Sequence, residues 1–161
     1  MPRRIRFEAV YPFAPEQVWA ALTDPVALGE WLMPNNFLPV VGHRFQFTTK
    51  PAPGFSGIVK CEVLELSEPS RLAFSWCGGG IETVVTFDVI PIGAASTRIV
   101  MEQTGFKGMR GLMVSNILKG GWKRMIEQRL MAAASRVAGG HYFPDPGANE
   151  SQCHTDLKET S

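Results

Sequence analysis

The sequence predicts an α+β fold, in which a curved antiparallel sheet of about six strands wraps around a long C-terminal helix. Three observations predict it. Short segments of alternating apolar and polar residues fill the middle of the chain, turn-forming residues separate them, and a long segment with apolar residues at helical spacing follows. A sheet with one apolar face needs a cover, and the long helix supplies it.

The chain begins with the alternating segment RIRFEAV, which predicts a half-buried strand. Two short helices follow this strand. PEQVWAALT places Trp19 and Leu22 on one face, and a second helix begins after Asp24, a suitable N-cap, and ends near Leu32. Because a helix of two turns is not stable alone in water, we expect it to close one end of the space between the sheet and the long helix.

Five further strands are expected in the middle of the chain, within HRFQFTT, GIVKCEVLEL, RLAFSW, ETVVTFDVI and STRIVMEQT. Their connectors, KPAPGFSG, SEPS, CGGG and PIGAA, are rich in the residues that form turns. Short strands joined by such turns are typical of an antiparallel meander with one apolar face.

The long helix is predicted over about residues 112–137, where Trp122 and Ile126 belong to an apolar stripe at helical spacing. Gly120 and Gly121 lie inside this stripe, and each glycine in a helix interior costs about 1 kcal/mol relative to alanine. Either the helix breaks there or the backbone needs a close approach to a neighbour. We favour a continuous or kinked helix.

Composition limits the classes of function. The chain has 161 residues and a net charge of +1, from 16 basic and 15 acidic residues, which gives no electrostatic reason to expect a nucleic acid or an anionic membrane as partner. No apolar run approaches the roughly 18 residues that span a bilayer, and no apolar segment of a signal peptide follows the N-terminal arginines. We therefore expect a cytoplasmic protein, either a monomer or a homodimer.

The composition changes after Gly140. We expect residues 1–139 to form one domain and residues 140–161, which are polar and without periodicity, to form a flexible tail. The tail contains Cys153, His154 and Asp156, which are residue types that ligate metals, but a metal site needs a second cluster that the sequence does not supply. No metal or cofactor is expected.

Six segments in order resemble one group of proteins: VWAALTDPVALGEWLMP, VGHRFQF, EVLELSEPSRLAFSW, TVVTFDV, TRIVMEQTGF and GGW. Over roughly residues 4–138 the chain resembles the START-like (SRPBCC) superfamily, which has the helix-grip fold, and within it the group named after the activator of heat-shock protein 90 ATPase. The resemblance implies a deep cavity between sheet and helix, which many relatives use to hold lipids, sterols, polyketides or other apolar molecules. It does not imply one activity, because a fold hosts many functions.

The inward positions of the predicted strands, short helices and long helix are almost all aromatic, aliphatic or sulfur-bearing. Such side chains suit a pocket for an apolar ligand, but they suit a filled core equally well. The candidate ligand-binding residues are Trp31, Met33, Phe37, Phe45, Phe47, Val59, Cys61, Phe74, Trp76, Val85, Phe87, Met101, Gln103, Phe106, Met113 and Trp122.

Gln103 is the polar residue of this set, and its amide must find a partner either in the protein or on a ligand. Trp76 and Trp122 carry indole N–H donors that a ligand carbonyl would accept. Strand alternation places Cys61 on the inward face, where no basic group is expected nearby to lower its pKa, so we interpret it as a small hydrophobic residue.

No catalytic residue is assigned from the sequence, because strand alternation places Glu62, Glu82, Asp88 and Arg98 on the outer face. A bulge of one residue would exchange the faces, so Glu62, Glu65 and Glu82 stay open as catalytic candidates.

Three functions follow as hypotheses. The favoured one is the binding of a small hydrophobic or amphipathic ligand without catalysis. The second is an enzyme of the cyclase, aromatase or hydrolase kind, which requires a charged residue inside the cavity. The third is a regulator of a chaperone ATPase that acts by protein contact, on the outer face, and is indifferent to changes in the cavity.

Overall fold

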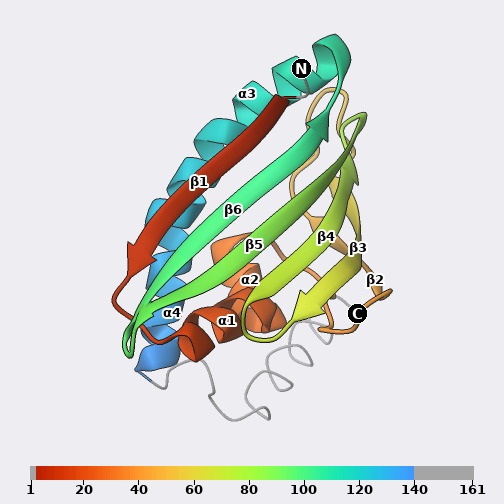
Figure 1. The fold of residues 1–161 in the computed structure, drawn as a ribbon. Helices are drawn as coiled ribbons and strands as arrows, with labels where there is room; N and C mark the ends of the chain where they lie inside the picture. The colour runs from red at the N-terminus through yellow and green to blue at the C-terminus, as the bar shows by residue number, and fades with distance from the viewer. Residues whose placement is uncertain (1–2, 140–161) are drawn as a thin grey trace.

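The computed structural model describes residues 3–139 and confirms the predicted helix-grip fold (Figure 1). Six antiparallel strands form one sheet in the order β1-β6-β5-β4-β3-β2, so the first strand pairs with the last. The strands are Arg3–Tyr11 (β1), Arg44–Thr48 (β2), Ile58–Ser67 (β3), Arg71–Gly78 (β4), Ile81–Gly93 (β5) and Ser96–Phe106 (β6).

The helices cover one face of this sheet, and α1 (Pro15–Thr23) and α2 (Pro25–Trp31) lie at the end of the sheet where the C-terminal helical segment finishes (Figure 1). That segment consists of α3 (Gly108–Arg124), a π-helical turn (Met125–Arg129) and α4 (Leu130–Ala138). None of the helices within residues 3–139 combines the length and the apolar character needed to cross a bilayer.

One local prediction needs correction, and another is confirmed. The connector PIGAA was expected to be a turn, but β5 continues through its first three residues to Gly93, and only Ala94 and Ala95 form the turn. A register shift against β6 between Pro91 and Gly93 accommodates the proline. The helix does not need a close approach at Gly120 and Gly121, since a Cβ atom at either position would meet nothing within 4 Å. The helix is continuous there, and it changes only at the π-helical turn that follows.

The π-helical turn contacts the end of the first strand. The buried hydroxyl of Tyr11 donates a hydrogen bond to the carbonyl oxygen of Ile126, while the N–H of Leu130 reaches the carbonyl of Met125, five residues back. Burial raises the pKa of Tyr11 well above its usual value, so the hydroxyl stays protonated and remains a donor. A π turn holds one more residue than an α turn, and apolar periodicity does not reveal it.

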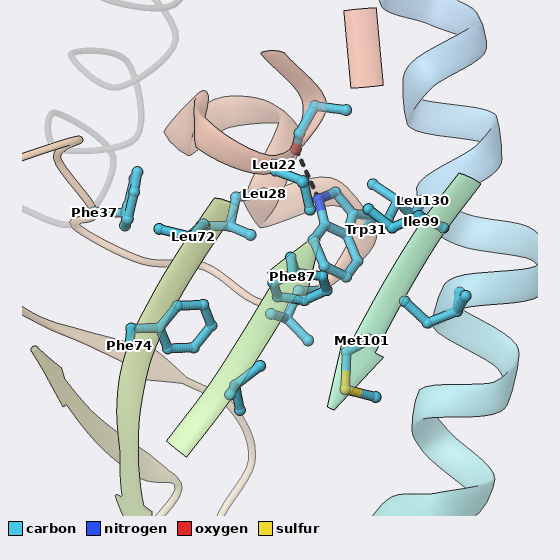
Figure 2. Packing of buried hydrophobic residues seen from close by; sticks show 14 of the residues in the cluster. Leu22, Leu28, Trp31, Phe37, Leu72, Phe74, Phe87, Ile99, Met101 and Leu130 are labelled. Carbon is cyan, nitrogen blue, oxygen red and sulfur yellow. Dashed lines mark hydrogen bonds between the residues drawn. The ribbon is translucent and has the colours of Figure 1, made fainter. Parts of the chain in front are cut away.

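The core lies between the sheet and the C-terminal helical segment, and α2 is held against it by Trp31 (Figure 2). The indole N–H of Trp31 donates to the carbonyl of Ala21 at 2.9 Å, and the ring meets Phe87 edge-on with centroids 6.0 Å apart. The carboxylate of Asp24 accepts from the N–H of Val26, as expected of an N-cap. Helix α2 is therefore stabilised by the core, as its short length requires.

We predict that Tyr11→Phe lowers the free energy of unfolding by about 1 to 2 kcal/mol, because it removes the hydroxyl and leaves the buried carbonyl of Ile126 without this donor. Urea denaturation measures the change. Ser70→Ala is the matched control, since it removes an exposed hydroxyl-to-carbonyl hydrogen bond and should cost less than about 0.5 kcal/mol. Equal stability of Tyr11→Phe and the native chain would contradict the assigned role.

Candidate functional site

A cavity of about 680 Å³ lies between α3 and the half of the sheet formed by β3, β4 and β5. The sheet contributes Val59, Trp76 and Ile81 to its wall. Helix α3 forms the opposite wall, and the loop between β2 and β3 forms a rim. The cavity occupies the position that the resemblance implies for a ligand.

Five of the sixteen sequence-predicted ligand-binding residues line this cavity: Met33, Val59, Trp76, Met113 and Trp122. The other eleven are buried, and the structure places them in the packed interior, where they do not line the cavity. They are Trp31, Phe37, Phe45, Phe47, Cys61, Phe74, Val85, Phe87, Met101, Gln103 and Phe106.

The aromatic side chains of the packed interior contact one another. Phe45 meets Phe74 with ring centroids 5.6 Å apart. Phe74 and Phe87, which Figure 2 labels, lie on the same inward face with ring centroids 6.2 Å apart. Edge-to-face and tilted contacts at these distances fill the space between sheet and helix. The inward face of the sheet therefore has a filled part and a hollow part.

The floor of the cavity is fixed by a buried hydrogen-bond chain. The indole N–H of Trp122 donates to the Gln103 side-chain oxygen at 2.8 Å, and the Gln103 amide donates to the Thr83 hydroxyl at 2.9 Å. The Thr83 hydroxyl donates in turn to the carbonyl of Trp76 at 2.8 Å. The amide of Gln103 thus finds its partners in the protein, and the two tryptophan rings are held with centroids 5.6 Å apart.

The α3 wall carries large apolar side chains that solvent reaches. Met109, Met113 and Ile117 follow one another at four-residue spacing on the helix and line the cavity, yet they are 79%, 64% and 73% exposed. Contiguous exposed apolar side chains of this size mark binding surfaces more often than plain protein surface. The cavity therefore opens to solvent along α3.

The loop between β2 and β3 forms the rim through Phe55, which sequence analysis treated as part of a turn. The N–H groups of Ala52 and Phe55 each donate to the other residue's carbonyl, at 2.9 and 2.8 Å, so the loop tip is a closed turn. Gly57 has a φ of +88°, and a Cβ there would lie 2.4 Å from the carbonyl oxygen of Thr49. A lone aromatic residue inside a glycine- and proline-rich connector was the signal that could have identified Phe55.

Arg110 was also missed, and it is the charged side chain of residues 3–139 that lines the cavity. It lies in the first turn of α3. Its Nε donates to the carbonyl of Gly79 at 2.7 Å, and its Nη2 donates to the carbonyl of Gly54 at 3.1 Å. The guanidinium group thus connects α3 with two loops at the rim.

The acidic residues considered for catalysis stay outside. A register shift does occur in β3 between Val63 and Glu65, but Glu62 pairs with Arg44 at 3.4 Å and Glu65 pairs with Arg71 at 2.9 Å on the exposed face. Arg71 also contacts Asp88. Within residues 3–139 no carboxylate lines the cavity.

The remaining reactive groups do not form a site in the described part of the chain. Burial, and to a lesser extent the neighbouring Cys77, raises the pKa of the Cys61 thiol, which keeps it protonated and suits a small hydrophobic residue. Residues 3–139 contain no group of three His, Cys, Asp or Glu side chains able to hold a metal. The cluster of Cys153, His154 and Asp156 lies outside the described residues, as does the predicted tail at 140–161.

Comparison with known proteins connects this geometry to a family. The sequence model for the "Activator of Hsp90 ATPase homolog 1-like protein" family matches residues 12–135. A search among proteins of curated function finds no significant match.

Solved structures share the fold. Protein MLL2253 from Mesorhizobium loti is 32% identical, with a TM-score of 0.75, over 83% of this chain and 98% of that one. DynU16, a protein in the dynemicin biosynthetic locus, is 24% identical (TM-score 0.66; 85% of this chain and 48% of that one). An Hsp90 activator from Plasmodium falciparum is 19% identical (TM-score 0.63; 75% and 88%). The last two similarities concern the fold alone. The family match and the similarity to MLL2253 show that the chain belongs to the activator of Hsp90 ATPase homolog 1-like family.

Proposed function

We propose that the protein binds a small hydrophobic or amphipathic molecule in the cavity between α3 and the sheet, without transforming it. The observation that carries the proposal is an apolar cavity of about 680 Å³ that is bordered by solvent-exposed methionine and isoleucine side chains. Its volume lies within the roughly 300 to 1,000 Å³ typical of ligand sites.

The composition of the lining supports an irregular apolar ligand. Four of the seven methionines of the chain line the cavity: Met33, Met109, Met113 and Met125. Methionine has three rotatable bonds and a polarizable sulfur, so it adapts to ligands of varied shape. Burying Met109 and Met113 under a ligand would also remove exposed apolar surface from water, which favours binding.

We propose binding without catalysis because of the ionisable side chains that line the cavity. Within residues 3–139, Arg110 is the ionisable side chain that lines the cavity, and a guanidinium stays protonated near neutral pH. It therefore does not exchange protons as a general acid or base. An enzyme reaction would require an acid or base that the described lining does not supply.

A second candidate function is regulation of an Hsp90-type chaperone by protein contact. It is supported by the family to which the chain belongs and by the shared fold of the Plasmodium falciparum activator. This function predicts stimulation of the chaperone ATPase by the purified protein, and the stimulation should survive substitutions that fill the cavity.

Two adjacent glycines provide a matched test of the cavity. Gly121 lines it and Gly120 does not, and a Cβ atom at either position meets nothing within 4 Å. We predict that Gly121→Leu fills the cavity and weakens binding of the uncharged dye N-phenyl-1-naphthylamine at least tenfold, whereas Gly120→Leu binds it as the native chain does. Both variants should keep or gain stability, because leucine is a better helix former than glycine.

Dye fluorescence titration and thermal unfolding measure the two effects. Native mass spectrometry of the freshly purified protein, followed by extraction, identifies any molecule that copurifies. Equal dye affinity in the two glycine variants would refute the cavity as the binding site. ATPase stimulation in both variants, together with no dye binding in the native chain, would favour the chaperone function.

The hydrogen-bond chain on the cavity floor gives a further prediction. Gln103→Leu leaves the buried indole N–H of Trp122 without its acceptor, so we expect the free energy of unfolding to fall by about 1 to 3 kcal/mol and dye affinity to decrease as the ring loses its fixed orientation. Urea denaturation and dye titration measure both. Thr104→Val, at the adjacent exposed position of β6, is the control and should change neither. If Gln103→Leu were as stable as the native protein, the hydrogen bonds through Gln103 would not be what holds the Trp122 ring in place.

A further inference from the structure

Arg110 carries an unbalanced charge at the cavity. Arg6, Arg44 and Arg71 each pair with carboxylates on the outer surface. Within residues 3–139 no carboxylate forms an ion pair with Arg110, and its two hydrogen bonds go to backbone carbonyls. A guanidinium has five N–H donors, so three of them have no acceptor among the described residues.

The protein backbone is shaped to hold this side chain in place. Gly80 has a φ of +83°, and a Cβ atom there would lie 2.2 Å from the Nε of Arg110. Gly54 has a φ of +77°, and its Cβ would lie 3.0 Å from Nη2. Any other residue at position 80 would displace the guanidinium, so Gly80 of the segment CGGG provides space for Arg110 in addition to its part in the turn.

The chemistry of this arrangement favours one class of ligand. The rest of the described lining is almost entirely apolar, with Thr49 as its hydroxyl-bearing side chain. An apolar ligand body would contact the methionines and tryptophans, and a charged group on the same molecule would meet Arg110 at the rim. A planar carboxylate accepts two parallel N–H bonds from one guanidinium, and its single negative charge balances the single positive charge.

We propose that the ligand is an amphiphile with one carboxylate head group and that Arg110 binds this head group. The inference rests on the proposed binding function and adds the ligand class and the residue that recognises it. An apolar cavity without a charged partner would prefer an alcohol to a carboxylate of the same chain length, because the carboxylate is more strongly hydrated. A cavity in which Arg110 binds the head group reverses this order.

Displacement of N-phenyl-1-naphthylamine at pH 8 by decanoate and by 1-decanol tests the proposal. We expect the native chain to bind decanoate about tenfold more tightly than 1-decanol, and Arg110→Gln to bind 1-decanol more tightly than decanoate. Arg110→Lys keeps the charge and should retain part of the preference. Arg124→Gln, the same charge change in the last turn of α3 and outside the cavity lining, is the matched control and should bind both ligands as the native chain does.

The possible failures are distinguishable. If neither the dye nor either ligand binds the native chain, the proposed function is wrong and the head-group assignment is wrong with it. If both ligands bind and the native chain does not prefer decanoate, only the head-group assignment is overturned. An Arg110→Gln variant that loses affinity for both ligands equally would show that Arg110 acts only by connecting α3 to the two loops, which also overturns the assignment.

Discussion

The hydrogen bond from Tyr11 to the carbonyl of Ile126 joins the end of the first strand to the π-helical turn, and this turn divides the C-terminal helical segment into two parts with different surroundings. On the C-terminal side of this turn, α4 packs with Leu130, Ala133, Ala134 and Val137 buried. On the N-terminal side, α3 buries only Gly111, Ser115 and Trp122. One continuous helical segment thus has a packed half and a half that borders a cavity, and the wide turn that Tyr11 contacts separates them.

The two ends of the sheet are closed in different ways. At the α4 end, α1 and α2 supply Trp31 and the aliphatic side chains that complete the core. At the α3 end, no helix within residues 3–139 fills the space, and the closure there consists of the β2–β3 loop and the turn between β4 and β5, which Arg110 connects to α3. Side chains fill the α4 end of the sheet. At the α3 end, hydrogen bonds from Arg110 hold the two loops around a cavity that is open to solvent. Loops held in this way are the segments that exchange most easily between open and closed states.

Sequence periodicity predicted the strands, the short helices and the long helix because alternation and helical spacing report directly which face of an element is buried. It did not separate Met113, which lines the cavity, from Phe74, which lies in the packed core, since both are apolar residues on inward faces. That distinction depends on the distance between α3 and the sheet. Arg110 and Phe55 were missed for another reason, because their positions depend on loops whose backbone is set by glycines at positive φ.

Gly120 and Gly121, two of the four glycines in α3, extend this argument to the stability of the helix. Each lowers helix stability by about 1 kcal/mol relative to alanine, and neither is required by contact with a neighbour. Side chains in protein interiors pack closely and leave few voids. An apolar cavity of about 680 Å³ beside a glycine therefore lowers the stability of the fold, and the packing of the core gives no reason for it. At Gly121 the missing side chain leaves the cavity open, and a ligand that occupies the space would restore the lost contacts. Nothing in the structure explains Gly120. The loss of stability at Gly121, which keeps a cavity open, is typical of a binding site, because binding requires space that folding alone would fill.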